Sequence, residues 1–157
     1  MKIIGNYSLD HSPAAVFAAL NDPSVLLLTI PGCQALEQTG STSYAMTITA
    51  GVASIKGTYN GLVELADQNA PHAFTLKASG SGGPGTVQAD VKVSLAESAE
   101  GCALTYEADA VVGGVIGGVG QRVLSGVSKK TANEFFAAVN RYLAGDRSAA
   151  AVVQQSE

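Results

Sequence analysis

The feature that most constrains this fold is a change of hydrophobic period near residue 113. Between residues 33 and 112, apolar and polar residues alternate in runs of six to twelve, separated by Gly, Pro, Asn and Asp. Such alternation predicts half-buried β-strands. After the glycine cluster at 113–120, apolar residues recur at three- and four-residue spacing, which predicts a helix over about 116–144. At 1.5 Å per residue, this helix would be about 40 Å long.

The short breaks between the alternating runs indicate an antiparallel sheet. We expect strands at 2–9, 33–38, 42–50, 53–66, 73–80, 86–96 and 102–112. The breaks between most of these strands are short enough for hairpins. Ser12-Pro13 and Asp22-Pro23 each place a capping residue before a proline, which predicts two short helices after the first strand.

An antiparallel sheet needs a cover for its apolar face, and the C-terminal helix is the only element long enough. The sequence therefore predicts an α+β helix-grip fold, in which a curved antiparallel sheet of about seven strands wraps around the long helix. We expect one domain over 1–144 and a flexible tail over 145–157. A chain of 157 residues can bury a sufficient core without disulfides or metal.

Several classes of function lack support in the sequence. The net charge is −4, there is no Trp, and no basic stripe is present, so nucleic-acid binding is not expected. Cys33 and Cys102 match no metal-site spacing, and His11 and His72 match no catalytic one. The segment 113–120 lacks the Lys-Ser/Thr of a phosphate-binding loop. We expect no catalytic residues, no metal site and no enzyme activity.

The remaining signals concern location. No secretory signal and no run of about 18 apolar residues is present, which predicts a cytoplasmic protein. Residues 115–157 contain five basic and three acidic residues, against four and ten in residues 1–114. This asymmetry is open to two interpretations, namely attraction to an anionic membrane or acidic partner, or an ordinary solvated helix face.

Apolar residues make up 46% of the chain and charged residues 14%, against about 25% charged in typical domains. Alternation turns many small residues toward the helix. These are Ala50, Gly57, Gly61, Ala78, Gly80, Ala89, Ala108 and Ala110. The helix region adds Gly117, Gly118, Gly120 and Gly126. Small residues on both surfaces predict an internal cavity with Tyr44, Tyr59 and Tyr106 as its polar groups. The alternative is that the glycines mark bulges and the helix docks tightly.

Seven short segments occur in an order that resembles a known family. They are Asp22-Pro23, Ile30-Pro31-Gly32-Cys33, KGTYNG at 56–61, GSGGPG at 80–85, Leu104-Thr105-Tyr106, Gly113-Gly114 and Phe135-Phe136. Over about residues 1–144, the chain resembles the CoxG family of carbon monoxide dehydrogenase subunits, within the START/polyketide-cyclase-like helix-grip superfamily.

The resemblance implies an accessory protein with an apolar cavity and no covalent cofactor. Members are encoded beside molybdenum-containing carbon monoxide dehydrogenases, and the inferred role is to carry a menaquinone-type quinone, bound non-covalently, between the membrane and the enzyme. Many members have a C-terminal extension associated with membrane contact. The corresponding expectation here is peripheral contact with the inner face of the cell membrane.

The leading hypothesis is therefore a quinone carrier. One alternative is a structural adaptor that recruits the dehydrogenase without a ligand, through the apolar helix SVLLLTI. Another is a cyclase-type enzyme that acts by shape and a tyrosine. The residues expected to bind the apolar ligand are Leu27, Ile30, Met46, Ile48, Tyr59, Leu76, Ala89, Tyr106, Gly120 and Leu124.

Overall fold

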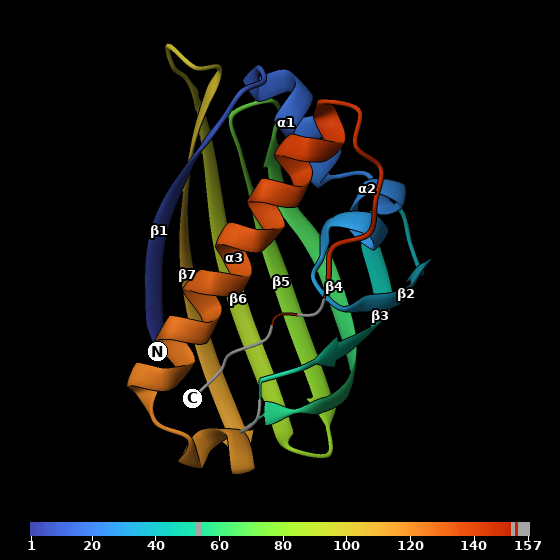
Figure 1. Ribbon diagram of the computed structural model, residues 1–157, viewed down its shortest axis with the longest axis vertical. Helices are drawn as coiled ribbons and strands as arrows, with labels where there is room; N and C mark the ends of the chain where they lie inside the picture. The colour runs from blue at the N-terminus through green and yellow to red at the C-terminus, as the bar shows by residue number, and fades with distance from the viewer. Residues whose placement is uncertain (53–54, 152, 154–157) are drawn as a thin grey trace.

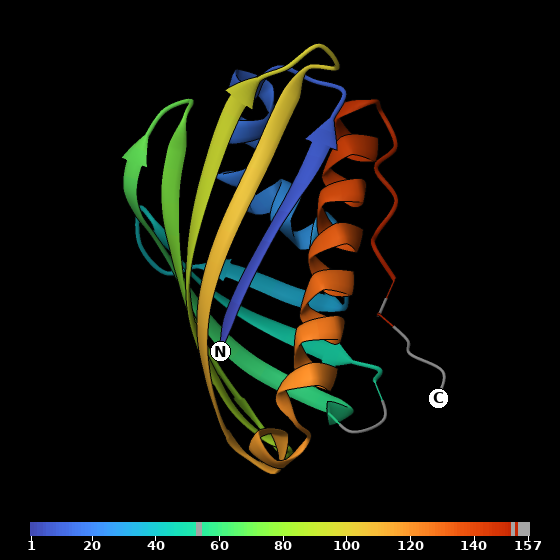
Figure 2. The ribbon, with the colours of Figure 1, turned by 90° about the vertical axis from the view of Figure 1, so that its left-hand side faces the viewer.

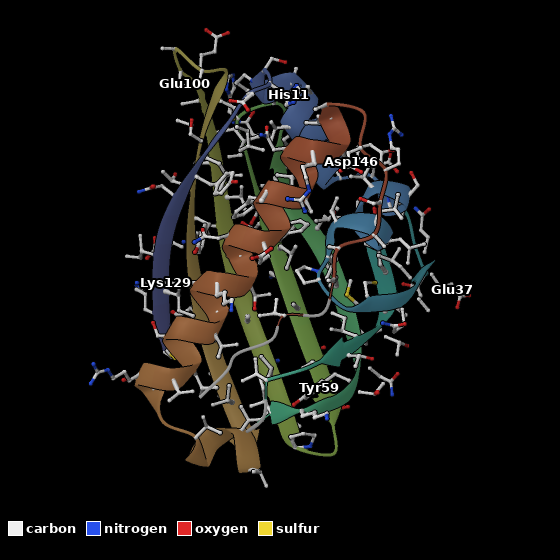
Figure 3. All side chains as sticks on the ribbon, in the orientation of Figure 1. His11, Glu37, Tyr59, Glu100, Lys129 and Asp146 are labelled. Atoms are coloured by element: carbon white, nitrogen blue, oxygen red, sulfur yellow. The ribbon has the colours of Figure 1, made fainter. Side chains whose placement is uncertain are left out.

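The computed structural model describes residues 1–52, 55–151 and 153, and it has two layers, a curved sheet and a helical cover (Figures 1 and 2). The strands are β1 (Lys2–Leu9), β2 (Cys33–Gln38), β3 (Ser43–Ala50), β4 (Gly57–Asn69), β5 (Ala73–Gly82), β6 (Gly85–Glu97) and β7 (Cys102–Gly114). The helices are α1 (Pro13–Leu20), α2 (Pro23–Thr29) and α3 (Gln121–Leu143), and a 3₁₀ turn, η2 (Val115–Gly118), precedes α3.

The seven strands form one antiparallel sheet in the order β1-β7-β6-β5-β4-β3-β2. From β2 to β7, each strand pairs with the next in the chain, as the hairpin signals predict. The first strand instead pairs with the last, in the register Lys2 opposite Asp109 and Leu9 opposite Cys102. Figure 2 shows the sheet curving around α3, which confirms the predicted α+β helix-grip fold.

Local chemistry explains the two short helices. The Ser12 hydroxyl accepts a hydrogen bond from the Ala15 N–H at 3.2 Å, and the Asp22 carboxylate accepts one from the Ser24 N–H at 3.0 Å. Each helix has a proline in its first turn, where the missing N–H costs nothing. Both helices sit at one end of the sheet beside the C-terminal part of α3 (Figure 1).

The predicted start of the long helix, near residue 116, is wrong. The apolar residues Ile116 and Val119 fit the helical period, but Gly120 adopts φ +104°, a conformation that an α-helix cannot contain. The segment after β7 is therefore a 3₁₀ turn followed by a break, and α3 begins at Gln121. The predicted strand 53–66 begins at Gly57 and continues to Asn69, and residues 53–54 lie outside the described residues.

One half of the space between the layers is densely packed. Phe136 and Val139 of α3 are buried, and the Phe136 ring lies 5.7 Å from the Tyr106 ring and 5.9 Å from the Tyr7 ring. Phe17 of α1 meets Phe74 of β5 edge to face at 5.6 Å. Large side chains from both layers thus interlock at the end of the molecule that carries α1.

Part of the chain beyond α3 returns along α2 (Figure 1). The Ala150 N–H donates a hydrogen bond to the Leu28 carbonyl at 2.8 Å. The Arg147 guanidinium lies over the Tyr142 ring, 3.9 Å from its centroid. Residues 152 and 154–157 of the predicted flexible tail lie outside the described residues.

Candidate functional site

The other half of the space between the layers is hollow, and the strand register shows why. Gly61 pairs with Gly80, and one row further along Ala78, Ala89 and Ala110 lie side by side on β5, β6 and β7. All of these residues face α3, as the alternation predicts. Because glycine and alanine project little from the sheet, this part of the concave face stays far from the helix. Packing here lacks the interleaved large side chains that fill the other half.

The resulting cavity has a volume of about 300 Å³. Its lining is almost entirely apolar. The lining residues are Met1, Met46, Ile48, Ile55, Tyr59, Gly61, Val63, Ala78, Ser79, Gly80, Val87, Ala110, Val112, Ile116, Leu124, Val127 and Ser128. A volume of this size is at the lower end of the range of about 300–1,000 Å³ for small-molecule sites. The predicted cavity is therefore present.

The prediction that glycines of the helix region create space for the cavity is wrong. Gly120 and Gly126 were expected to add space, but a Cβ at either position would meet no atom within 4 Å, and both residues are exposed. Leu124, Val127 and Ser128 line the helix side instead. Val123 of α3 is 38% exposed and does not belong to the lining. The space comes from the sheet and not from the helix glycines.

Besides Ser79 and the amino group of Met1, the lining includes two side-chain hydroxyls that donate to backbone carbonyls. The Tyr59 hydroxyl donates a hydrogen bond to the Ile55 carbonyl at 2.6 Å, and the Ser128 hydroxyl donates one to the Leu124 carbonyl at 2.7 Å. Burial raises the pKa of Tyr59, so the phenol is protonated at neutral pH. Its oxygen retains lone pairs that can accept a hydrogen bond from a ligand or from water. Among the described lining residues, none carries a carboxylate or an imidazole.

The ten residues chosen from the sequence divide into two groups. Met46, Ile48, Tyr59 and Leu124 line the cavity. The other six lie outside its lining. Leu27 is 37% exposed on α2, Ile30 and Leu76 pack against the core, Ala89 is half-buried on β6, Tyr106 is buried, and Gly120 precedes α3.

The two other predicted polar groups have different surroundings. Tyr44 and Tyr106 belong to the packed core and not to the cavity wall. The Tyr106 hydroxyl lies against Gly5 of β1, where a Cβ would come within 2.4 Å of it. Burial raises the pKa of both phenols, and the Asp22 carboxylate adds to the effect at Tyr44.

Some lining residues could be predicted in part from the sequence. Gly61, Ala78, Gly80 and Ala110 were all assigned to the inward face by alternation, but nothing in the sequence shows which inward residues lie in the hollow half. Met1 carries no such signal. Its place in the lining depends on the pairing of β1 with β7, and its amino group donates a hydrogen bond to the Ala110 carbonyl at 2.7 Å.

The convex face of the sheet also carries a hollow, of about 380 Å³, over Leu62, Ser79, Gln88 and Val111. It is more open than the cavity beneath α3, and a larger share of its wall is polar. Shape and apolarity therefore favour the cavity on the concave face as the ligand site.

A curved antiparallel sheet that holds a long C-terminal helix above an apolar cavity defines the helix-grip class of proteins. Within this class, the family model of CoxG, a subunit of carbon monoxide dehydrogenase, matches residues 5–144. The chain belongs to the CoxG family, as the order of its motifs indicates. Membership points to an accessory role for carbon monoxide dehydrogenase, since CoxG is an accessory and not a catalytic component.

Three solved structures resemble the chain in fold. A conserved protein from Geobacillus kaustophilus is 34% identical, with a TM-score of 0.88 over 92% of this chain and 95% of its own. A protein from Chromobacterium violaceum has 14% identity and a TM-score of 0.70, covering 92% and 99% of the two chains. One from Mycobacterium smegmatis has 14% identity and a TM-score of 0.67, covering 91% and 90%. The last two show the fold alone.

Among curated proteins, none matches the chain. In the part of the chain that the structure describes, no helix has both the length and the apolar character needed to cross a membrane.

Proposed function

We propose that this protein is a carrier of an apolar small molecule, a menaquinone-type quinone, which it passes between the membrane and a molybdenum-containing carbon monoxide dehydrogenase. The observation that carries the proposal is the apolar cavity between α3 and the small residues of β4, β5 and β7. The family resemblance suggests the partner enzyme and the quinone, and the apolar wall of the cavity supports a largely apolar ligand.

The wall suits a flat, largely apolar ring. Burying apolar surface contributes about 25 cal/mol per Å², so a ring and the first units of an isoprenoid tail would bind from water. The hydroxyls of Tyr59 and Ser128 could donate a hydrogen bond to a quinone carbonyl by turning away from the Ile55 and Leu124 carbonyls, to which they donate in the free protein. A cavity of about 300 Å³ takes the ring and the beginning of a tail, and a longer tail would extend through the mouth.

A quinone should prefer the cavity over the membrane by only a small free energy, because the bilayer is as apolar as this cavity. A carrier benefits from that balance, since a ligand held much more tightly than by lipid would not be released. We therefore expect moderate affinity for a short-chain quinone in water and easy exchange with lipid.

A cavity-filling variant tests the proposal. Gly80 lines the cavity, and a Cβ there would meet only the Asn60 carbonyl oxygen, at 3.7 Å, so Gly80→Val places two methyl groups in the hollow without a backbone clash. Valine is also favourable in a strand. Isothermal titration with a menaquinone of one or two isoprenoid units should show binding to the wild type and about tenfold weaker binding to Gly80→Val, a loss of about 1.4 kcal/mol.

Ser81→Val is the matched control. Ser81 is the next residue of β5 and is exposed on the convex face, so the same side chain is added outside the cavity. Its affinity for the quinone should equal that of the wild type. No binding to the wild type, or equal losses in both variants, would contradict a carrier function.

A second candidate function is supported by one observation. Leu27 is 37% exposed on α2, between buried Leu26 and half-buried Leu28, so an apolar side chain remains available to a partner. A structural adaptor would use this surface to hold the dehydrogenase without carrying a ligand. Under that function Leu27→Ser would weaken the complex with the enzyme, and Gly80→Val would change nothing.

A further inference from the structure

The outer face of the sheet, which is turned away from α3, carries an uncharged area beside a row of charges (Figure 2). The strand register arranges the side chains of this face in rows that cross the sheet. The charged row consists of Lys2, Asp109, Asp90, Lys77 and Glu64. The next row consists of Val111, Gln88, Ser79 and Leu62, and the row after it of Gly113, Thr86, Ser81 and Asn60. We call these three rows the outer patch.

Two large apolar side chains are exposed in the outer patch. Leu62 is 59% exposed and Val111 is 71% exposed, and they stand at the two ends of one row. The hollow of about 380 Å³ on this face lies between the two uncharged rows, and Leu62 also lines two more hollows, of about 380 and 430 Å³. The outer patch is therefore not uniformly convex, and a second surface can approach it closely.

The uncharged rows are complementary to themselves about a two-fold axis that runs along the strands between β5 and β6. Such an axis exchanges β6 with β5 and β7 with β4. It places Val111 of one copy against Leu62 of a second copy, so an apolar side chain meets an apolar one. It also places Gln88 against Ser79 of the second copy, which brings a side-chain amide opposite a hydroxyl.

The charged row matches itself at its centre under the same axis. Asp90 of each copy lies opposite Lys77 of the other copy, so two ion pairs would form between the copies. Inside one chain, these two side chains form no ion pair in the part that the structure describes, so both charges are available. Further out, Asp109 lies opposite Glu64 of the second copy, and these two carboxylates would repel each other.

We propose that the outer patch is a contact between two copies of this chain, related by that two-fold axis. Face-to-face sheets pack about 10 Å apart with their strands within about 30° of each other, and a two-fold contact uses the same surface on both subunits. A second copy fits better than an unrelated protein, because the pattern of apolar, polar and charged side chains matches itself. Both cavities would face outward in this dimer, so neither would be covered.

The size of the outer patch predicts a weak dimer. Strands lie about 4.8 Å apart and side chains on one face repeat about every 6.8 Å, so four strands and three rows span about 400 Å². Two copies would therefore bury at least about 800 Å², which lies in the range of weak, transient complexes. The repulsion between Asp109 and Glu64 also opposes tight association. We expect a dissociation constant of about 10–100 µM.

Sedimentation velocity of the full chain, from about 5 to 500 µM, tests the proposal. The wild type should change from monomer to dimer over this range, and Leu62→Ser should weaken the dimer about tenfold or more because each copy loses an apolar contact. Ile4→Ser is the matched control. Ile4 is 61% exposed on the same face of the sheet but lies outside the outer patch, so its loss should leave the dimer unchanged.

Charge exchange provides an independent arm. Asp90→Lys places lysine opposite Lys77 of the second copy and should weaken the dimer about tenfold or more. Adding Lys77→Asp to the same chain restores opposite charges and should return the affinity to within about threefold of the wild type. Asp109→Asn removes the outer repulsion and should strengthen the dimer, which a folding defect could not do. Circular dichroism checks that each variant is folded.

Three outcomes would each overturn the proposal. They are a monomer at every concentration, equal effects of Leu62→Ser and Ile4→Ser, and no recovery on combining Asp90→Lys with Lys77→Asp. The inference does not depend on the carrier function, because the outer patch and the cavity lie on opposite faces of the sheet. Leu62→Ser should therefore bind quinone as the wild type does.

Discussion

At the scale of single residues, position within the sheet decides what a tyrosine does. Tyr59 and Tyr106 both face α3, and both were expected to line the cavity. The Tyr59 ring covers its cross-strand partner Gly82, where a Cβ would come within 2.9 Å of the ring, and it also lines the cavity. Tyr106 lies between Val93 and Gly5 and fills the space that Gly5 leaves free. One tyrosine is therefore available to a ligand, and the other is part of the core.

The close contact of Tyr106 with Gly5 leads to a stability prediction. A Cβ at Gly5 would lie 2.4–2.7 Å from three atoms of the Tyr106 ring and hydroxyl, so Gly5→Ala must displace a packed ring. We expect a loss of about 1–3 kcal/mol in the free energy of unfolding, measured by denaturant titration. Gly83→Ala is the control, because a Cβ there meets nothing within 4 Å. Equal stabilities of the two variants would show that Tyr106 moves aside freely.

At the scale of elements, the sequence predicts the boundaries that local signals determine and misses one that depends on backbone conformation. The strands and the two short helices follow from alternation and from Ser-Pro and Asp-Pro starts, which act within a few residues. The start of α3 does not follow, because Ile116 and Val119 keep the helical period across a break caused by the backbone at Gly120. Periodicity reports which residues are apolar, but it does not report backbone conformation at a glycine.

The cap of α2 provides a prediction at this scale. The Asp22 carboxylate accepts hydrogen bonds from the Ser24 N–H at 3.0 Å and the Ser24 hydroxyl at 2.7 Å. Asp22→Ala should lower the free energy of unfolding by about 1 kcal/mol, and Asp22→Asn, which keeps an acceptor, should recover most of it. Thermal unfolding followed by circular dichroism measures both. If Asp22→Asn were as unstable as Asp22→Ala, the cap would not be the cause.

At the scale of the whole molecule, two gradients run along the same axis. Large core side chains at one end give way to small ones at the other, and Lys129 lies toward the cavity end whereas Glu100 and Asp146 lie at the opposite end. The first gradient could be predicted only in part, because alternation identifies the inward residues without showing which rows meet across seven strands. The second was visible as an excess of basic residues after position 114, but its relation to the cavity required the fold. Leu76 and Ala89 illustrate the difficulty, since both face inward and yet lie outside the cavity lining.

The central claim is that the hollow end holds an apolar quinone between α3 and the small residues of the sheet. The most direct measurement is a crystal structure of the full chain with a short-chain menaquinone. We predict electron density for the ring in contact with Met46, Gly80 and Leu124, with its tail directed toward η2. Density only on the convex face, or a cavity closed by α3 settling onto the sheet with no ligand bound, would contradict the account.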